Sequence, residues 1–421
     1  MGFWLWHFKC SRKRAMRLWP LVFLCAAAYA QITPVSVEPS AGGATTQNFS
    51  FVFTDPNGPS DLSVVNILIN DALDGRHACY LAFTGGNTLN LVDDAGDAAG
   101  PFATSPMSPT LANPLQNSQC TVLSGSLSTN GNTLSLYLTI TASASFIGNR
   151  LIYLAARSAT ANSGWQPLGV WSPSPAPLKM DPARSTGLDQ TYTFRVPNLP
   201  IVDILINSAL DGRHACYVAF VTATKSLFLV DDAGDAGGPY SGTVLPASAG
   251  TTFSNSQCTI DAGASSISIN TDTLTLTLAI TFNPSFSGNH TIYAATSSWL
   301  AVGTVSLGPD SLAPTLSQIA PTTVQAGSAD LFLTVSGGNF SFPAPCALVC
   351  GFACPGGTVI NFGHVDLLTE RTGAGDLQAT IPASLLASAR SLNVTVRNTV
   401  TIECFGTESH VSSAVAFGIN P

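Results

Sequence analysis

The chain has 421 residues, of which 10% are charged, and its formal net charge is −8. An average globular protein carries about 25% charged residues. A nucleic-acid-binding surface needs clustered basic side chains, so this composition argues against nucleic acid as a partner. The hydrophobic share of 45% excludes a disordered chain. The length has room for about three domains of ordinary size.

The first thirty residues are predicted to be a signal peptide. A basic segment precedes the apolar run 18–28, which is shorter than the roughly 20 residues that span a bilayer. Small residues place the expected cleavage before Gln31, and Met16 is an alternative start to Met1. We therefore expect an exported protein, either extracellular, on the cell surface or periplasmic, with no transmembrane segment after cleavage.

A tandem duplication dominates the next part of the chain. The sequence NILINDALDGRHACY (66–80) returns as DILINSALDGRHACY (203–217). LVDDAGDAAGP (91–101) returns as LVDDAGDAGGP (229–239), and both copies then contain NSQC. Two copies mean two structural units. A residue retained in both copies was needed for the shared fold or for a shared site.

Short alternating segments joined by Gly, Pro and Asn turns predict an all-β fold in both copies. The expected strands of the first copy include 48–53, 64–69, 134–140 and 151–156, and corresponding segments recur in the second copy. We expect one β-sandwich, repeat 1, over 31–174, and a second, repeat 2, over 175–309.

The sequence changes character from about residue 310. The segments AGSADLFLTVSGGNF (326–340) and ATIPASLL (379–386) resemble an IPT/TIG domain. This resemblance implies an immunoglobulin-like β-sandwich over 310–421. The whole chain is thus expected to form three tandem immunoglobulin-like β-sandwiches after a signal peptide. The two repeats also resemble modules of secreted bacterial proteins to which no activity is attached.

Export decides how the cysteines are interpreted, because an even number in an exported chain predicts disulfides before metal sites. Each repeat has one pair at matching places, which predicts the bonds Cys79–Cys120 and Cys216–Cys258. By closing a loop in the unfolded chain, each disulfide should stabilise the fold by roughly 3–4 kcal/mol. The IPT/TIG resemblance implies that two inserted loops lie at the same end of the third sandwich. The other four cysteines are in these loops and are expected to form two disulfide bonds. One of these bonds joins Cys404 to Cys346, Cys350 or Cys354.

The carboxylates of the DDAGD motif are candidates for a ligand site. Closely spaced Asp side chains with backbone carbonyls can bind calcium, although the spacing is not that of an EF-hand. The alternative is a turn in which each Asp bonds its own backbone. The residues concerned are Asp93, Asp94 and Asp97 in repeat 1 and Asp231, Asp232 and Asp235 in repeat 2.

The DGRHACY motif offers a second candidate, because His77 and His214 follow an Asp-Gly turn. A histidine base oriented by an aspartate would also need a nucleophile, and no nucleophile motif accompanies it. An Arg–Asp pair across the turn is the simpler interpretation. Trp165, Trp171 and Trp299 are expected in the core, with a sugar-binding platform as the alternative.

These observations predict an exported, non-enzymatic, multi-domain protein for adhesion, ligand binding or structural support at a cell surface or outside the cell. Its partner would be a protein or glycan of unknown identity, and no cofactor is expected apart from calcium at the Asp residues. One alternative is a calcium-dependent glycan-binding module. Another is a carbohydrate-active hydrolase, which would need two carboxylates facing one cleft about 5–10 Å apart.

Overall fold

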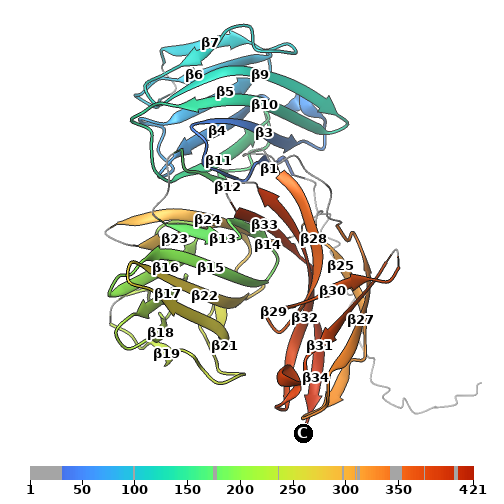
Figure 1. Ribbon diagram of the computed structural model, residues 1–421. Coiled ribbons are helices and arrows are strands. Elements are labelled where there is room, and N and C mark those ends of the chain that lie inside the picture. Colours follow the sequence, from blue (N-terminus) through green and yellow to red (C-terminus); the bar gives the residue numbers. More distant parts are fainter. Residues whose placement is uncertain are drawn as a thin grey trace, which may run out of the picture. The chain divides into compact units, whose positions relative to one another are not determined.

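The structure, a computed structural model, is described over residues 31–421. Within this range the segments 98–99, 174–177, 236, 296–297, 309, 311–312, 342–352, 374 and 403–405 are excluded. The expected signal peptide lies outside the described residues. The described part is built from strands and two short 3-10 helices, η1 (Pro59–Asp61) and η2 (Ala383–Leu386), so the prediction of an all-β protein is confirmed (Figure 1). Neither of these helices is long and apolar enough to cross a bilayer.

Repeat 1 is a sandwich of two sheets whose strands bury alternate side chains. In β3 the side chains of Phe49, Phe51 and Phe53 point into the core, and Ser50 and Val52 between them point outward. The first sheet has the order β1 (Thr33–Glu38), β3 (Thr46–Thr54), β10 (Thr133–Ala142), β9 (Cys120–Asn130) and β8 (Leu115–Gln116). The second has the order β2 (Ala41–Gly42), β12 (Gln166–Trp171), β11 (Arg150–Arg157), β4 (Val64–Asn70), β5 (Cys79–Thr84), β6 (Thr88–Val92) and β7 (Phe102–Pro106).

Repeat 2 restates this arrangement strand by strand. Its first sheet has the order β13 (Lys179–Asp181), β15 (Asp189–Pro197), β22 (Thr273–Phe282), β21 (Cys258–Ile269) and β20 (Thr252–Ser254). The strands of its second sheet are β14 (Arg184–Thr186), β24 (Trp299–Leu307), β23 (Gly288–Ala295), β16 (Ile201–Asn207), β17 (Cys216–Val221), β18 (Ser226–Leu229) and β19 (Ser241–Val244). The segments predicted as strands in both copies are strands.

The C-terminal domain is a third sandwich. Its smaller sheet has the order β25 (Thr315–Ala320), β27 (Leu331–Gly338), β31 (Asp376–Ile381) and β30 (Thr369–Arg371). The other sheet is centred on the long strand β32, which pairs with β28 on one edge and with β33 and β34 on the other. Its strands are β26 (Thr323–Gln325), β28 (Ala353–Phe362), β29 (Val365–Leu367), β32 (Arg390–Ile402), β33 (Gly406–Val411) and β34 (Val415–Asn420).

One sheet runs through repeat 2 and the C-terminal domain. The three-residue strand β14 pairs in parallel with β24 on one side and with β33 on the other, so a continuous 13-stranded sheet results. Arg184 of β14 thereby lies opposite Glu408, 224 residues further along the chain. The sequence predicts successive sandwiches and gives no sign of this shared sheet, because β14 is too short to give a strand pattern.

Both disulfides predicted within the repeats are confirmed. The S–S distance is 1.99 Å for Cys79–Cys120 and 2.02 Å for Cys216–Cys258, and all four cysteines are buried in the cores of their repeats. The expected bonds of the C-terminal domain stay predictions. Cys346, Cys350 and Cys404 lie outside the described residues, and for Cys354 the backbone alone is described, opposite Thr401.

The DGR and DDAGD turns of each repeat touch backbone to backbone. A Cβ atom added to Gly96 would lie 2.2 Å from the carbonyl carbon of Gly75, and Gly96 has a φ of 72°. Gly212 and Gly234 repeat this contact in the second copy, with 2.1 Å at the same place. Only glycine satisfies both the close approach and the positive φ, which is a structural reason for retaining DG and AGD in both copies.

We expect Gly96→Ala to destabilise the chain 31–421 far more than Gly131→Ala. Gly131 also has a positive φ of 55°, but no heavy atom lies within 4 Å of its added Cβ. The control therefore costs about 1 kcal/mol for backbone strain alone. Gly96→Ala adds a steric clash and should lose roughly 3 kcal/mol or more. Denaturant unfolding measures both, and equal losses would show that the glycine contact is dispensable.

Candidate functional site

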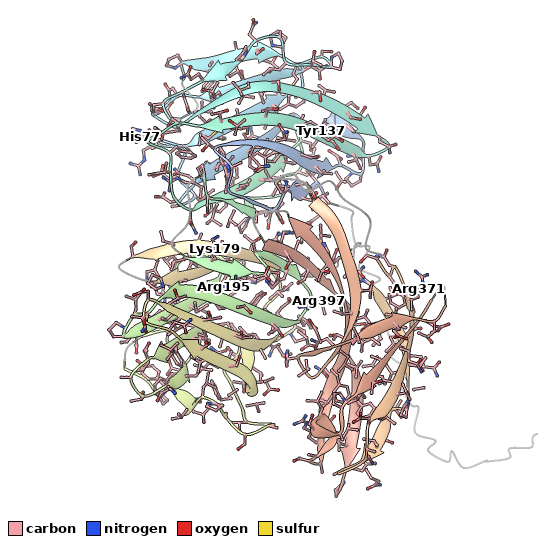
Figure 2. All side chains as sticks on the ribbon, in the orientation of Figure 1. His77, Tyr137, Lys179, Arg195, Arg371 and Arg397 are labelled. Carbon is pink, nitrogen blue, oxygen red and sulfur yellow. A yellow bond between two sulfur atoms is a disulfide. The ribbon has the colours of Figure 1, made fainter. Side chains whose placement is uncertain are left out.

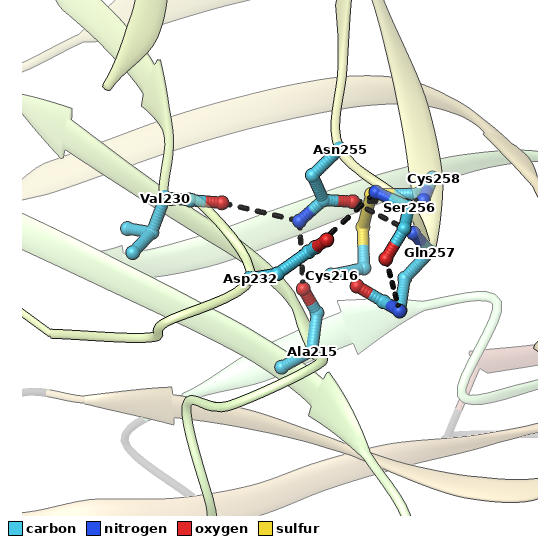
Figure 3. The surroundings of a disulfide bond; sticks show 8 residues. All are labelled: Ala215, Cys216, Val230, Asp232, Asn255, Ser256, Gln257 and Cys258. Atoms are coloured by element: carbon cyan, nitrogen blue, oxygen red, sulfur yellow. Dashed lines mark hydrogen bonds between the residues drawn. A yellow bond between two sulfur atoms is a disulfide. The ribbon is translucent and has the colours of Figure 1, made fainter. Parts of the chain in front are cut away.

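The NSQC motif acts as a clamp that closes each sandwich around its disulfide. In repeat 1 the side-chain amide of Asn117 donates to the carbonyl oxygens of Ala78 (2.9 Å) and Val92 (3.0 Å). Its own carbonyl oxygen accepts from the backbone N–H of Cys120 at 3.0 Å. Asn255 makes the same bonds in repeat 2, as Figure 3 shows. One amide thus satisfies polar backbone groups of three segments.

The carboxylates of the DDAGD motif accept hydrogen bonds from their own turns and from the serine of the NSQC motif. Asp93 accepts from the N–H of Ala95 at 3.1 Å, and Asp94 accepts from the hydroxyl of Ser118 at 2.5 Å. Asp97 is exposed on the same turn. In repeat 2 the corresponding bonds run from Ala233 N–H to Asp231, from Ser256 N–H to Asp232 and from Gly237 N–H to Asp235. The bonds of Asp93, Asp231 and Asp235 to the N–H two residues further on are typical of Asx turns. The bonds of Asp94 and Asp232 instead join the turn to the NSQC motif.

No three His, Cys, Asp or Glu side chains come together as a metal site would need within the part of the chain that is described. Calcium at the DDAGD turns therefore stays a prediction of the sequence. In the neighbouring turn Asp74 binds Arg76, with Arg76 Nη2 at 2.6 Å from Asp74 Oδ2. The hydrogen bonds from Arg76 lower the pKa of Asp74 to about 2. The carboxylate of Asp74 is therefore paired with Arg76, and the carboxylate of Asp211 is paired in the same way with Arg213.

The two repeats pack against each other through equivalent residues. Leu68 and Leu205 hold the same place in the two copies, as do Tyr153 and Tyr293, and all four belong to one buried cluster. Asn149 donates across the contact to the carbonyl oxygen of Ala301 at 2.7 Å. The second sheets therefore meet face to face with the same residues on both sides, as in an isologous dimer interface.

This contact also accounts for the tryptophans. Trp165 packs edge-on against Tyr80 with ring centroids 5.8 Å apart, and Trp299 packs in the same way against Tyr217. Both pairs border the cluster between the repeats. Trp171 is fully buried in the core of repeat 1. The three tryptophan rings therefore pack against other side chains. The structure does not display the alternative, a sugar-binding platform built from these rings.

Charged and polar side chains from all three sandwiches meet at the end of β14. The guanidinium of Arg184 contacts Glu408 with an Nε–Oε1 distance of 3.1 Å, and both side chains are buried. Ser40 of repeat 1 donates to the other oxygen of Glu408 at 3.0 Å. His410 lies 2.8 Å from Asp310, which also accepts from the hydroxyl of Thr186. We call this set the junction cluster.

Glu38 faces the junction cluster from the end of β1. Burial and the charge of Glu408 raise the pKa of Glu38 to about 7, against the opposing charges of His410 and Arg184. Burial by itself lowers the pKa of His410, but the hydrogen bond to Asp310 and the charge of Glu408 outweigh it, so the net pKa is raised. Both groups therefore hold protons more tightly in the folded chain than in the unfolded one.

A polar cleft of about 190 Å³ separates the first sheet of repeat 2 from the C-terminal domain. Asp189 accepts from the hydroxyl of Thr281 at 2.6 Å and from the amide of Asn393 at 3.2 Å. His364, in the turn between β28 and β29, lies 3.4 Å from the same Thr281 hydroxyl. Burial lowers the pKa of His364, against the charges of Asp189 and Asp261. These contacts fasten the C-terminal domain onto repeat 2.

The outer face of the first sheet of repeat 1 carries a larger, open hollow of about 570 Å³. We call it the repeat 1 hollow. It is lined by Glu38, Tyr137 and the hydroxyl and amide side chains of Thr46, Asn48, Ser50, Ser124, Ser126 and Thr139, among others. Tyr137 is 46% exposed. Figure 2 places Tyr137 and His77 on opposite sides of the first sandwich, so the hollow is separate from the DGRHACY motif.

The hollow is not among the candidate sites that the sequence indicates. The available signal was the alternation in LSLYLTI (134–140), in which every second residue is Ser, Tyr or Thr. That pattern predicts a strand with one solvent-exposed face. It does not say whether water, another domain or a ligand covers that face, because this depends on how separate sandwiches pack.

Comparison with protein-family models gives no match, and neither does comparison with curated proteins. Among solved structures, the chain is similar to an I-band fragment of titin, with 11% identity over 91% of this chain and 95% of that one, and a TM-score of 0.15. A marsupial T cell receptor gives 8% identity, 90% and 98% coverage and a TM-score of 0.18. Scores this low carry no argument about function, so the site is interpreted from its own geometry.

We expect calcium to leave the thermal midpoint of the oxidised chain 31–421 unchanged, because the DDAGD carboxylates already accept hydrogen bonds from the turn backbone and from the NSQC motif. Thermal unfolding in millimolar calcium and in chelator measures this. A rise of several degrees in calcium would contradict the expectation. If that rise were lost in Asp94→Ala and Asp232→Ala, the turns would be ion sites.

Stability should fall as the pH rises from about 5 to above 7. Between its unfolded value of 4.5 and about 7, folded Glu38 keeps a proton that the unfolded chain releases. The raised pKa of His410 acts in the same direction above its unfolded value. The unfolded state then binds fewer protons, which lowers the free energy of unfolding. Glu38 alone accounts for up to about 3 kcal/mol at 1.4 kcal/mol per pKa unit.

The measurement is the thermal midpoint of wild type, Glu38→Gln and the exposed control Glu370→Gln from pH 5 to pH 8. Glu38→Gln should flatten the slope and the control should keep it. His290 and His364, whose pKa values burial lowers, oppose the trend in all three proteins and so cancel in the comparison. Parallel slopes for wild type and Glu38→Gln would disprove the role of Glu38.

Proposed function

We propose that this chain is an exported, non-enzymatic β-sandwich protein that binds a ligand on the open sheet face of repeat 1. The observation that carries the proposal is the repeat 1 hollow. Its volume of about 570 Å³ is in the range of about 300–1,000 Å³ found for ligand sites. The corresponding face of repeat 2 is fastened to the C-terminal domain through Asp189 and Asn393. All described residues that line the hollow belong to repeat 1, and we infer that this face takes the ligand.

The retained motifs support a structural and not a chemical role for the duplicated residues. Their glycines allow two turns to touch, Asn117 and Asn255 clamp the disulfide region, and the Asp side chains accept bonds in the turns. A residue needed for the shared fold explains retention in both copies without shared catalysis. We further propose that the IPT/TIG-like C-terminal domain serves as a support, because it shares one sheet with repeat 2.

Two buried disulfides support an oxidising compartment outside the cytoplasm. When the full chain is expressed in a bacterium with an export pathway, we expect a mature protein that starts at Gln31 and lies in the periplasm or medium. N-terminal sequencing and thiol labelling under denaturing conditions test this, and all eight remaining cysteines should be protected. A chain that lacks residues 1–30 is the control and should stay cytoplasmic and reduced. An uncleaved, reduced full-length chain in the cytoplasm would refute export.

A further inference from the structure

We propose that the repeat 1 hollow is a glycan-binding site in which the ring of Tyr137 stacks on a sugar and the surrounding hydroxyl and amide groups bond its hydroxyls. This inference rests on the proposed ligand-binding function and names the class of its ligand: a neutral polysaccharide. Four features of the described residues carry the argument: the register of the face, its hydrogen bonds, its charge, and its divergence from repeat 2.

Strand register gathers the polar side chains of three strands around one ring. Tyr137 of β10 lies opposite Ser50 of β3 on one side and opposite Ser126 of β9 on the other. Two residues further along, Thr139 lies opposite Asn48 and Ser124. Residues two apart on a strand point to the same face, so all six side chains stand on the outer face. The ring is thus flanked by hydroxyl groups within one patch.

Hydrogen bonds across the strands hold these polar groups in place. Ser124 donates to the Thr139 hydroxyl at 3.0 Å, and Thr139 donates to the side-chain carbonyl of Asn48 at 2.8 Å. Nearer the strand end, the hydroxyls of Thr46 and Thr141 are 2.8 Å apart. Because the side chains are already ordered, binding a ligand costs less conformational entropy. A hydroxyl has one donor and two acceptor sites, so these groups can also bond a sugar.

The charge of the hollow favours a neutral ligand. Among the described residues that line it, Glu38 alone carries a carboxyl group, and it lies opposite Ser50 on the neighbouring strand β1. The lining contains no lysine or arginine that would pair with an acidic polymer. A half-exposed tyrosine offers a flat apolar face together with a polar tip, which suits a sugar ring with its apolar face and its hydroxyls.

Repeat 2 provides an internal comparison for Tyr137. The register that sets Tyr137 opposite Ser50 sets Thr277 opposite Thr193 in repeat 2. The ring is therefore not required by the shared fold. On the same sheet, Thr46 opposite Thr141 corresponds to Asp189 opposite Thr281, and Asp189 binds the C-terminal domain. The face that is covered carries a charge for docking, whereas the open face carries an aromatic ring.

The test uses the oxidised mature chain in affinity gel electrophoresis. The gels contain soluble neutral polysaccharides (xylan, mixed-linkage β-glucan, galactomannan and hydroxyethyl cellulose) or the acidic polymers alginate and polygalacturonate. We expect retardation by at least one neutral polymer. Tyr137→Ala should weaken that binding about tenfold or more, whereas Tyr137→Phe should retain it, because stacking needs the ring. Thr277→Ala, at the matching place in repeat 2, should bind as wild type.

Each other outcome overturns a defined part of the inference. Neutral binding that Tyr137→Ala leaves unchanged would refute the site but leave ligand binding by the protein intact. Retardation by acidic polymers alone would refute the neutral class, and no retardation in any gel would refute glycans as the ligand. The export experiment tests the proposed location separately, whichever of these three gel results is obtained. Unchanged unfolding midpoints of the variants would show that they fold, as expected for a half-exposed side chain.

Discussion

The structure depends on covering the apolar outer faces of two second sheets. Leu68 and Tyr153 in repeat 1, and Leu205 and Tyr293 in repeat 2, would lie in water if either repeat stood alone. Burying them against each other gains hydrophobic free energy for both repeats at once. The same contact also decides which surfaces remain. With the second sheets turned inward, the first sheets are the faces that other partners can reach.

Those remaining first sheets are used differently. The sheet of repeat 2 receives the C-terminal domain at the polar cleft around Asp189. The buried pair of Arg184 and Glu408 adds a second attachment, and Ser40 extends it to repeat 1. Breaking one partner of such a buried pair is costly, because the other charge stays buried without compensation. The C-terminal domain is thus fixed to both repeats, while the first sheet of repeat 1 presents its hollow.

The sequence predicted what local pattern and chemistry control. Alternation gave strands such as β3 and β10, and matched spacing in an exported chain gave Cys79–Cys120 and Cys216–Cys258. It did not give the three-residue strand β14, whose place is set by pairing with β33 more than 200 residues away. Nor did it single out Tyr137, since a polar face on a strand looks the same whether or not anything binds it.

The face-to-face contact of the repeats has a consequence for how such a protein can change. In a homodimer built the same way, one gene encodes both halves, so every substitution appears on both sides of the axis. Here the halves are encoded separately and can accept substitutions one at a time. Asp189 against Thr46, and Thr277 against Tyr137, are such single-sided changes. Duplication within one chain keeps the symmetry of the buried faces and releases the exposed ones from it.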